Sequence, residues 1–269
     1  QMSGSMQNIW DGVPAFKLLQ GLSSRNGIIS AELAKAGWAG PDDPLFGKLG
    51  YFNLFAGGCG NPEILTKELG KKYYCDAHFK LYPCCAVSHA AVDCALYLAN
   101  HYNLDYRKIK EAVLYVSRSG LNSFLSQPLD VGDFPHAGSA FNYKYHMATV
   151  LMNKSIKPEH FERRYVHSPE AINFMKKIRL EQLPGVEREL LCAKIRVTMN
   201  SGEQYEKLIE SPKGDPLGNP LTKDDIFNKF LSNLEFSKKI DSLKGKKLIS
   251  LLDRLEELEN INEVINLLT

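Results

Sequence analysis

The sequence predicts an α+β protein that is predominantly helical toward both ends, with a smaller α+β module between them that holds a short antiparallel sheet. Two observations predict this class. Apolar residues recur at helical spacing in the N-terminal and C-terminal parts, and short alternating apolar segments lie between them. We therefore expect residues 1–76 and 216–269 to form the helical part and residues 77–215 to form the α+β module.

The N-terminal segment predicts helices separated by glycine-containing turns. Residues 1–21 are punctuated by Gly and Ser and are expected to form a loop with a turn near Trp10. A helix is expected from Leu22 to Gly37, and its many small residues favour close packing, so we expect it to be buried. Shorter helical segments are expected at residues 47–55 and 62–69.

The middle of the chain carries the strongest helix signal and all of the strand signals. Apolar residues recur at helical spacing from Cys84 to His101, with Pro83 in the first turn, where proline is tolerated. A second helix is expected over Ser139–Met152, with His146 on its solvent face. Four segments alternate as strands do: Ala112–Val116, Ile178–Leu183, Ala193–Met199 and Tyr205–Ile209.

Two connections and the C-terminal part complete the prediction. Residues 121–135 are a long polar connection, typical of a lid or of the rim of a site. Residues 214–220 are rich in glycine and proline, and their prolines lack the N–H donors of a phosphate-binding loop, so we expect a rigid connector. Thr222 to Asp225 resembles a capping box, and the chain beyond it is expected to be nearly all helix.

Composition excludes several classes of protein. The formal net charge of +2 gives no reason to expect nucleic acid or an anionic membrane as a partner. No apolar run approaches the roughly 20 residues of a membrane span. Six cysteines in 269 residues are too few for a disulfide scaffold, so we expect reduced thiols and a cytoplasmic location. The first residue is Gln1, which indicates either a tag remnant or the middle of a longer protein.

The densest group of chemically active side chains lies in the segment Phe79–His89. A helix that begins near Cys84 would put Cys85, His89 and Asp93 on one stripe, where Asp93 could accept a hydrogen bond from His89 and raise its basicity. Lys80 would lie near the N-terminus of that helix, which favours an anion. A carboxylate-binding lysine beside an acid–base histidine is one interpretation of this segment.

Other interpretations of the segment stay open. Spacing alone favours a purely structural one, with Lys80 solvated, Cys85 as a buried apolar filler and His89 as a partner of Asp93 only. Cys85 and His89 could also form a nucleophile pair, although no nucleophile elbow lies nearby. A zinc site is a third interpretation, with the ligand types present but no common spacing: Cys75, His78, Cys84, Cys85 and His89. His136, in the long polar connection, could face a site.

The order and spacing of several motifs resemble the MmgE/PrpD family, which includes 2-methylcitrate dehydratase, cis-aconitate decarboxylase and iminodisuccinate epimerase. The most distinctive match is Phe79–Cys85 with His89 and Asp93. Further matches follow the order of the family's segments: Gly4–Met6, Gly21–Gly27, Ala31–Ala34, Gly37, Gly40-Pro41, Gly47, Gly50, Ala140, Phe141, Tyr145, Ala148 and Asn219–Phe230.

The resemblance implies a large helical domain and a smaller α+β lid, with the site in the cleft between them. It implies no metal or organic cofactor, usually a homodimer, and small di- or tricarboxylate substrates that undergo proton transfer beside a carboxylate. In that scheme the catalytic residues are Lys80, as a charge clamp, and His89. The remaining implied site residues divide into substrate-binding and supporting groups: Lys17, Cys85 and His136 bind substrate, and Tyr82 and Asp93 support them.

The sequence also departs from the family pattern. Decarboxylase-like members carry a histidine five residues after the motif lysine, and this chain has Cys85 there. A family lysine near the start of the segment falls on Phe16, with Lys17 one step along, and a family histidine falls on Leu19. Family members are also far longer, and this chain resembles only their C-terminal part.

Three functions therefore compete. The first is an MmgE/PrpD-type lyase or isomerase acting on a small polycarboxylate, as part of a full-length enzyme. The second is a truncated, non-catalytic relative that serves as a dimerising or ligand-binding module. The third is a zinc or thiol protein that uses Cys84 and Cys85.

Overall fold

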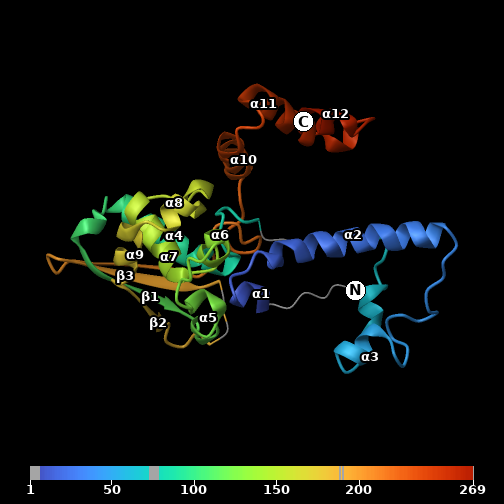
Figure 1. Cartoon of the computed structure of the whole chain (residues 1–269), viewed down its shortest axis with the longest axis horizontal. Coiled ribbons are helices and arrows are strands. Elements are labelled where there is room, and N and C mark those ends of the chain that lie inside the picture. The colour runs from blue at the N-terminus through green and yellow to red at the C-terminus, as the bar shows by residue number, and fades with distance from the viewer. Residues whose placement is uncertain (1–6, 73–78, 188, 190, 269) are drawn as a thin grey trace. The chain divides into compact units, whose positions relative to one another are not determined.

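A computed structural model describes residues 7–72, 79–187, 189 and 191–268 (Figure 1). Residues 15–72 belong to one compact unit, and residues 7–14 and 79–268 belong to the other. About half of the chain is helical, and the larger unit holds a four-stranded mixed sheet, so the α+β class is confirmed. None of the helices in the described ranges is long and apolar enough to cross a membrane.

The smaller unit is built from one long helix and short helical turns. Its elements are α2 (Ala15–Lys35), α3 (Tyr51–Phe55) and the 3₁₀ turn η1 (Pro62–Leu65). The helix begins seven residues before the predicted start at Leu22. The expectation that α2 is buried is wrong within the described unit, because Ile28 is 63% exposed and Ile29 and Leu33 are also exposed.

The sheet of the larger unit has the strand order β2-β1-β3-β4. Its strands match the four predicted segments: β1 (Ile109–Val116), β2 (Ile178–Gln182), β3 (Ala193–Met199) and β4 (Gln204–Ile209). The β1–β3 and β3–β4 pairs are antiparallel, but β1 and β2 are parallel. The prediction of an antiparallel sheet was wrong at this pair, because a long helical crossover joins β1 to β2 and returns the chain in the same direction.

Helices pack on the sheet and form the core with it (Figure 1). Helix α4 (His89–His101) contacts β3 and β4, and α7 (Tyr143–Asn153) packs against α4 and α9 (Pro169–Met175). The prediction that His146 is solvated was wrong: it is fully buried, because α7 has neighbours on more than one side. Shorter elements connect these helices: η3 (Tyr106–Lys108), α5 (Arg118–Leu121), η4 (Phe124–Ser126), α6 (Pro135–Ser139), η5 (Pro158–Phe161) and α8 (Arg163–Val166).

The start of α4 differs from the prediction. The chain makes a 3₁₀ turn, η2 (Ala86–Ser88), and the α-helix begins only at His89. Cys85 has extended backbone angles, and its N–H donates to the carbonyl of Ala140 at 3.0 Å. This tertiary hydrogen bond satisfies the N–H group of Cys85, which lies outside the helix. Cys85 therefore does not share a helical stripe with His89 and Asp93.

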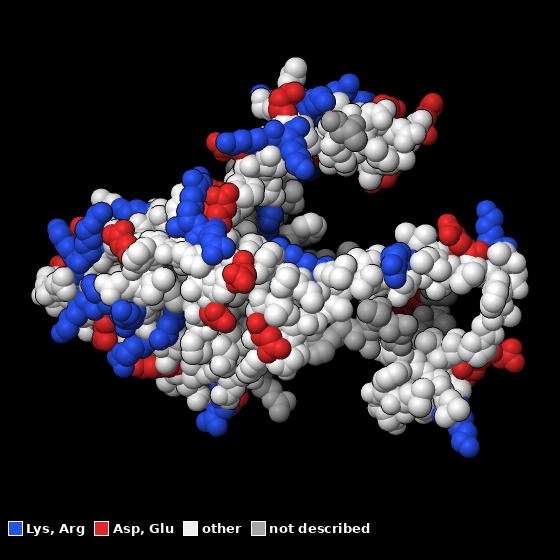
Figure 2. Space-filling view, in the orientation of Figure 1, with Lys and Arg blue, Asp and Glu red and all other residues white. Residues whose placement is uncertain are grey.

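Two end segments complete the larger unit. At its beginning, α1 (Gln7–Trp10) places the Trp10 ring edge-on to Phe124 at 6.4 Å. At its end, the predicted capping box is confirmed at Thr222 and Asp225. Three helices follow it, and they pack around a small core of Leu248, Leu251 and Val264. These helices are α10 (Lys223–Ser237), α11 (Ser242–Leu252) and α12 (Asn262–Leu268), with the 3₁₀ turn η6 (Leu255–Glu257) between the last two. Figure 2 shows basic and acidic side chains interspersed on the visible face of this unit.

Candidate functional site

The predicted cluster opens onto a small hollow of the larger unit. Lys80 and His89 line it from one segment, and Lys213 lines it from the loop after β4. The remaining lining residues are Phe79, Ala86, Leu191, Pro212, Gly214 and Asp215. Its volume is about 10 Å³, which is close to the room that one water molecule needs. Two of the predicted site residues, Lys80 and His89, are therefore brought together, and Lys213 lines the same hollow from a distant segment.

His89 is the first residue of α4 and is only 3% exposed. Burial lowers its pKa to about 4, and the nearby Lys80 ammonium acts in the same direction. Carbonyl groups of Cys84 and Tyr82 oppose this shift. The Nε2 atom is buried and has no hydrogen-bond partner in the described part of the chain. The imidazole is thus neutral at pH 7 and can accept a proton.

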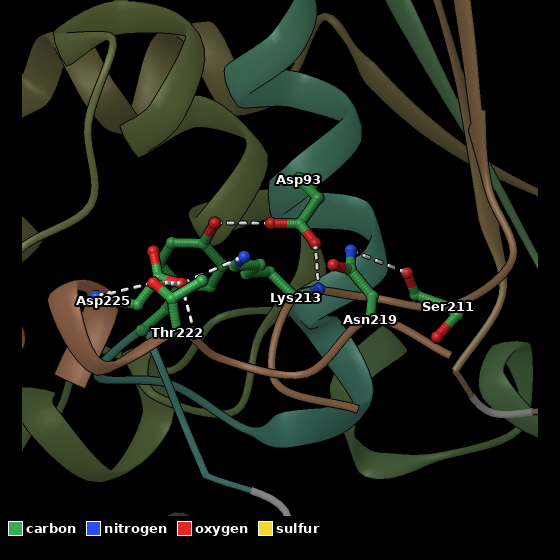
Figure 3. A network of polar contacts seen from close by, with 7 residues as sticks. Asp93, Ser211, Lys213, Asn219, Thr222 and Asp225 are labelled. Carbon is green, nitrogen blue, oxygen red and sulfur yellow. Dashed lines mark hydrogen bonds and ion pairs between the residues drawn. The ribbon is translucent and has the colours of Figure 1, made fainter. Parts of the chain in front are cut away.

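Asp93 lies one turn along α4 from His89, but it does not bind that ring. Its Oδ1 accepts a hydrogen bond from the Tyr82 hydroxyl, and its Oδ2 accepts one from the backbone N–H of Lys213 at 2.7 Å (Figure 3). Burial raises the pKa of Asp93, and its hydrogen bonds from Tyr82 and Lys213 oppose that rise. The predicted Asp93–His89 hydrogen bond was wrong, because Asp93 instead fastens the loop after β4 to α4.

Tyr82 completes this corner of the site. Its ring meets the His89 ring edge-on, with 5.0 Å between the centroids. Burial and the neighbouring Asp93 carboxylate raise the Tyr82 pKa well above its usual range, so the phenol stays protonated and donates. Tyr82 therefore positions His89 by contact and Asp93 by hydrogen bond.

The loop after β4 is held in one compact shape. The Ser211 hydroxyl donates to Asp215 at 2.6 Å, and the Gly214 N–H donates to the Asn219 carbonyl at 2.8 Å. Gly214 has a φ of +100°, and a Cβ there would collide with the carbonyl oxygen of Phe79. Glycine is thus required where this loop passes the Phe79–His89 segment.

Two lysines from the C-terminal side approach the segment. The Lys213 ammonium pairs with Asp225, at the start of α10, at 3.0 Å (Figure 3). The Lys229 ammonium donates to the backbone carbonyl of Lys80, and burial followed by the Lys80 charge lowers the Lys229 pKa. Neither residue was predicted from the sequence, although the position of Lys213 directly before the connector at residues 214–220 was a signal for it.

The thiols next to His89 are not activated. Cys84 is 4% exposed, and burial raises its pKa well above the ordinary thiol value. Burial also raises the pKa of Cys85. A nucleophilic cysteine needs a lowered pKa, so these two residues do not have the environment that the thiol interpretation requires.

The zinc interpretation gains no support from the described ranges, in which no group of three or more His, Cys, Asp or Glu side chains could hold a metal ion. Cys75 and His78, two of the proposed ligands, lie outside the described residues. The interpretation therefore rests on the residue types alone.

Two further predicted site residues do not line the hollow: His136 belongs to the larger unit, and Lys17 belongs to the smaller one. His136 belongs to α6, and its ring lies 6.2 Å from the Phe134 ring and 6.1 Å from the Phe161 ring. It does not line the hollow. Lys17 lies on α2 and is exposed. A larger hollow of about 430 Å³ occurs near Trp10 and Phe124, but it contains no predicted site residue.

Comparison with known proteins places this chain in a family. Residues 82–251 match the MmgE/PrpD C-terminal domain, and this match covers more than half of the chain. The chain is 25% identical to the cis-aconitate decarboxylase-like protein oryM of Aspergillus oryzae, over 100% of this chain and 58% of that protein. It is 25% identical to cis-aconitate decarboxylase of Mus musculus, over 72% of this chain and 39% of that protein. The chain thus spans about half the length of the curated relatives that it matches, and it belongs to the MmgE/PrpD family.

Proposed function

We propose that the protein carrying this chain is an MmgE/PrpD-type lyase or isomerase that moves a proton at a carbon beside a carboxylate of a small di- or tricarboxylate. The observation that carries the proposal is the pairing of a buried, neutral His89 with the Lys80 cation at one hollow. The relatives named cis-aconitate decarboxylase support the same class of substrate.

The chemistry follows from the charges of these groups. A substrate carboxylate beside Lys80 would be attracted to its ammonium group and would raise the pKa of the nearby imidazole. His89 Nε2 could then take the proton as the C–H bond breaks. The electron pair of that bond would move toward the carboxylate as an enolate, whose charge the lysine stabilises. In a dehydration, hydroxide would leave from the neighbouring carbon and depart as water with the proton that His89 took. In an epimerisation, a proton would return to the opposite face of the same carbon. A decarboxylation would run in the other direction, because loss of carbon dioxide leaves an electron pair on carbon that takes up a proton from protonated His89.

The hollow is one wall of such a site. At about 10 Å³ it is too small for a carboxylate in its present shape, so substrate would have to open it and contact other groups as well. A homodimer, a cytoplasmic location, a lid formed by residues 77–215 and the absence of a cofactor stay predictions from the sequence and the family resemblance.

Solvent hydrogen exchange tests the proton-transfer step. The full protein would be incubated in D₂O with cis-aconitate or 2-methylcitrate, and deuterium incorporation and product formation would be followed by NMR. We expect His89→Gln and Lys80→Met each to lower the rate by at least about 100-fold. His101→Gln is the matched control, because His101 is exposed at the other end of α4. Exchange or turnover that survives both site substitutions would refute the proposal.

A second candidate is a non-catalytic module that binds the same anions. Cys85 favours this candidate, because its buried thiol stays neutral and has no charge that would attract a carboxylate. Carboxylate binding without exchange or turnover in the full protein would support this candidate over the first.

A further inference from the structure

We propose that Lys213 is a specificity-determining residue that binds a second carboxylate of the substrate, and that Asp225 holds its ammonium group until substrate arrives. The inference rests on the proposed function and extends it to the number of carboxylates that the site requires. It begins from the hollow, which Lys80 and His89 line together with Lys213, a residue far from them in the sequence.

The backbone of Lys213 is fixed, whereas its ammonium group can move. Its N–H is bound by the Asp93 carboxylate at 2.7 Å, and the next residue, Gly214, lies against Phe79. The Cα of Lys213 is therefore anchored at the wall of the hollow. The side chain beyond it is a flexible four-carbon stem that is 30% exposed.

The partner of that ammonium group does not depend on it. Asp225 Oδ2 also accepts hydrogen bonds from the Thr222 N–H at 2.8 Å and from the Thr222 hydroxyl at 2.7 Å. This capping box keeps the Asp225 carboxylate satisfied at the start of α10 when the lysine leaves (Figure 3). The Asp225 side chain is 28% exposed, and partly exposed ion pairs are weak. A substrate carboxylate can thus compete for Lys213.

The other nearby lysine is not equivalent. The Lys229 ammonium is bound to the carbonyl oxygen of Lys80 and does not line the hollow. Lys80 and Lys213 are the two lysines among the residues that line it. With one carboxylate at Lys80, beside His89, a second carboxylate of the same molecule would reach Lys213. The chemistry favours di- and tricarboxylates over monocarboxylates.

Calorimetric binding tests this directly with three unreactive probes: propane-1,2,3-tricarboxylate, succinate and propionate. Lys213→Met should weaken binding of the first two by about tenfold or more and leave propionate unchanged. Lys213→Arg should retain most of the affinity. Lys223→Met is the matched control, because it breaks an exposed ion pair between Lys223, at the start of α10, and Asp253, at the end of α11, and it should have no effect.

Asp225→Asn separates substrate binding from a structural role. If Lys213 binds substrate, removing its competing partner should leave the affinity for succinate unchanged or tighter. If the ion pair merely holds α10 to the loop, Asp225→Asn and Lys213→Met should weaken binding alike, and the inference is wrong. Thermal unfolding of each variant shows that it is folded.

The outcomes also separate this inference from the proposed function. Binding that Lys80→Met abolishes and Lys213→Met leaves intact would overturn the inference alone. A wild-type protein that binds none of the three probes would overturn both. A Lys213→Met variant that weakens the binding of propionate and of succinate by the same factor would also contradict the inference, because the effect of Lys213 would then not depend on a second carboxylate.

Discussion

The carboxylate of Asp93 accepts the backbone N–H of Lys213 at 2.7 Å, so a helix that begins at His89 is fastened to the loop after β4. The same carboxylate accepts the Tyr82 hydroxyl. One partly buried side chain therefore sets the distance between the two segments that line the hollow. Asp93 acts as a positioning residue in this arrangement.

Replacement of Asp93 should loosen the loop without changing the charge of His89 directly. Asp93→Ala leaves the Lys213 N–H and the Tyr82 hydroxyl without their acceptor, which should cost about 1–3 kcal/mol in the free energy of unfolding. Urea unfolding measures this cost. Asp105→Ala, at the exposed start of η3, is a control that should cost less. Equal costs for the two variants would contradict the anchoring role.

Stability should fall as the solution is acidified below neutral pH. Burial lowers the pKa of His89 to about 4 and that of His146 to about 3, whereas an unfolded histidine titrates near about 6.5. The unfolded chain therefore binds these protons at a higher pH than the folded chain. The stabilisation is complete above about pH 6.5 and is lost as pH falls toward 4, at about 1.4 kcal/mol per pH unit for each imidazole.

Unfolding at a series of pH values checks this dependence. His89→Gln should reduce the slope of the free energy of unfolding against pH by the contribution of one imidazole. Burial raises the pKa of Asp93, so protonation of Asp93 favours the folded state at acidic pH and opposes the loss of stability. Comparison of His89→Gln with the wild type removes this shared contribution and leaves that of His89. An unchanged slope in His89→Gln would show that its imidazole does not titrate abnormally.

Local patterns predicted the elements well. The alternation in Ala193–Met199 is a property of the strand itself, and every second residue is buried in the sheet. The capping box at Thr222 needs only residues within one turn, so it too could be predicted. Lys80 and His89 meet at the hollow because they are close in sequence.

Relationships between distant residues could not be predicted in the same way. Cys85 stays outside α4 because its N–H bonds to Ala140, which lies on the far side of β1 in the sequence. The parallel pairing of β1 and β2 depends on where the crossover returns the chain. Lys213 reaches the site through a loop with no periodicity, and only the fold brings it next to Asp93.

Gly214 should be far less tolerant of a side chain than another glycine with similar backbone angles. Gly214→Ala combines a φ of +100° with a collision at the Phe79 carbonyl. It should cost about 1–3 kcal/mol in the free energy of unfolding and should also weaken carboxylate binding. Gly202, in the β3–β4 hairpin, has a φ of +92° and open space where an added Cβ would lie. Gly202→Ala therefore measures the cost of the positive φ without a collision. A Gly214→Ala variant no worse than Gly202→Ala would refute the close approach.

Alkylation should distinguish the buried thiols from the accessible ones. Burial raises the pKa of Cys84 and Cys85, and iodoacetamide reacts with exposed thiolates. We expect mass spectrometry to find Cys59 and Cys192, which are partly exposed, modified before Cys84 and Cys85. Urea should expose all four thiols to comparable labelling. Fast modification of native Cys85 near neutral pH would instead indicate a thiolate beside His89, and would restore the nucleophile interpretation of this segment.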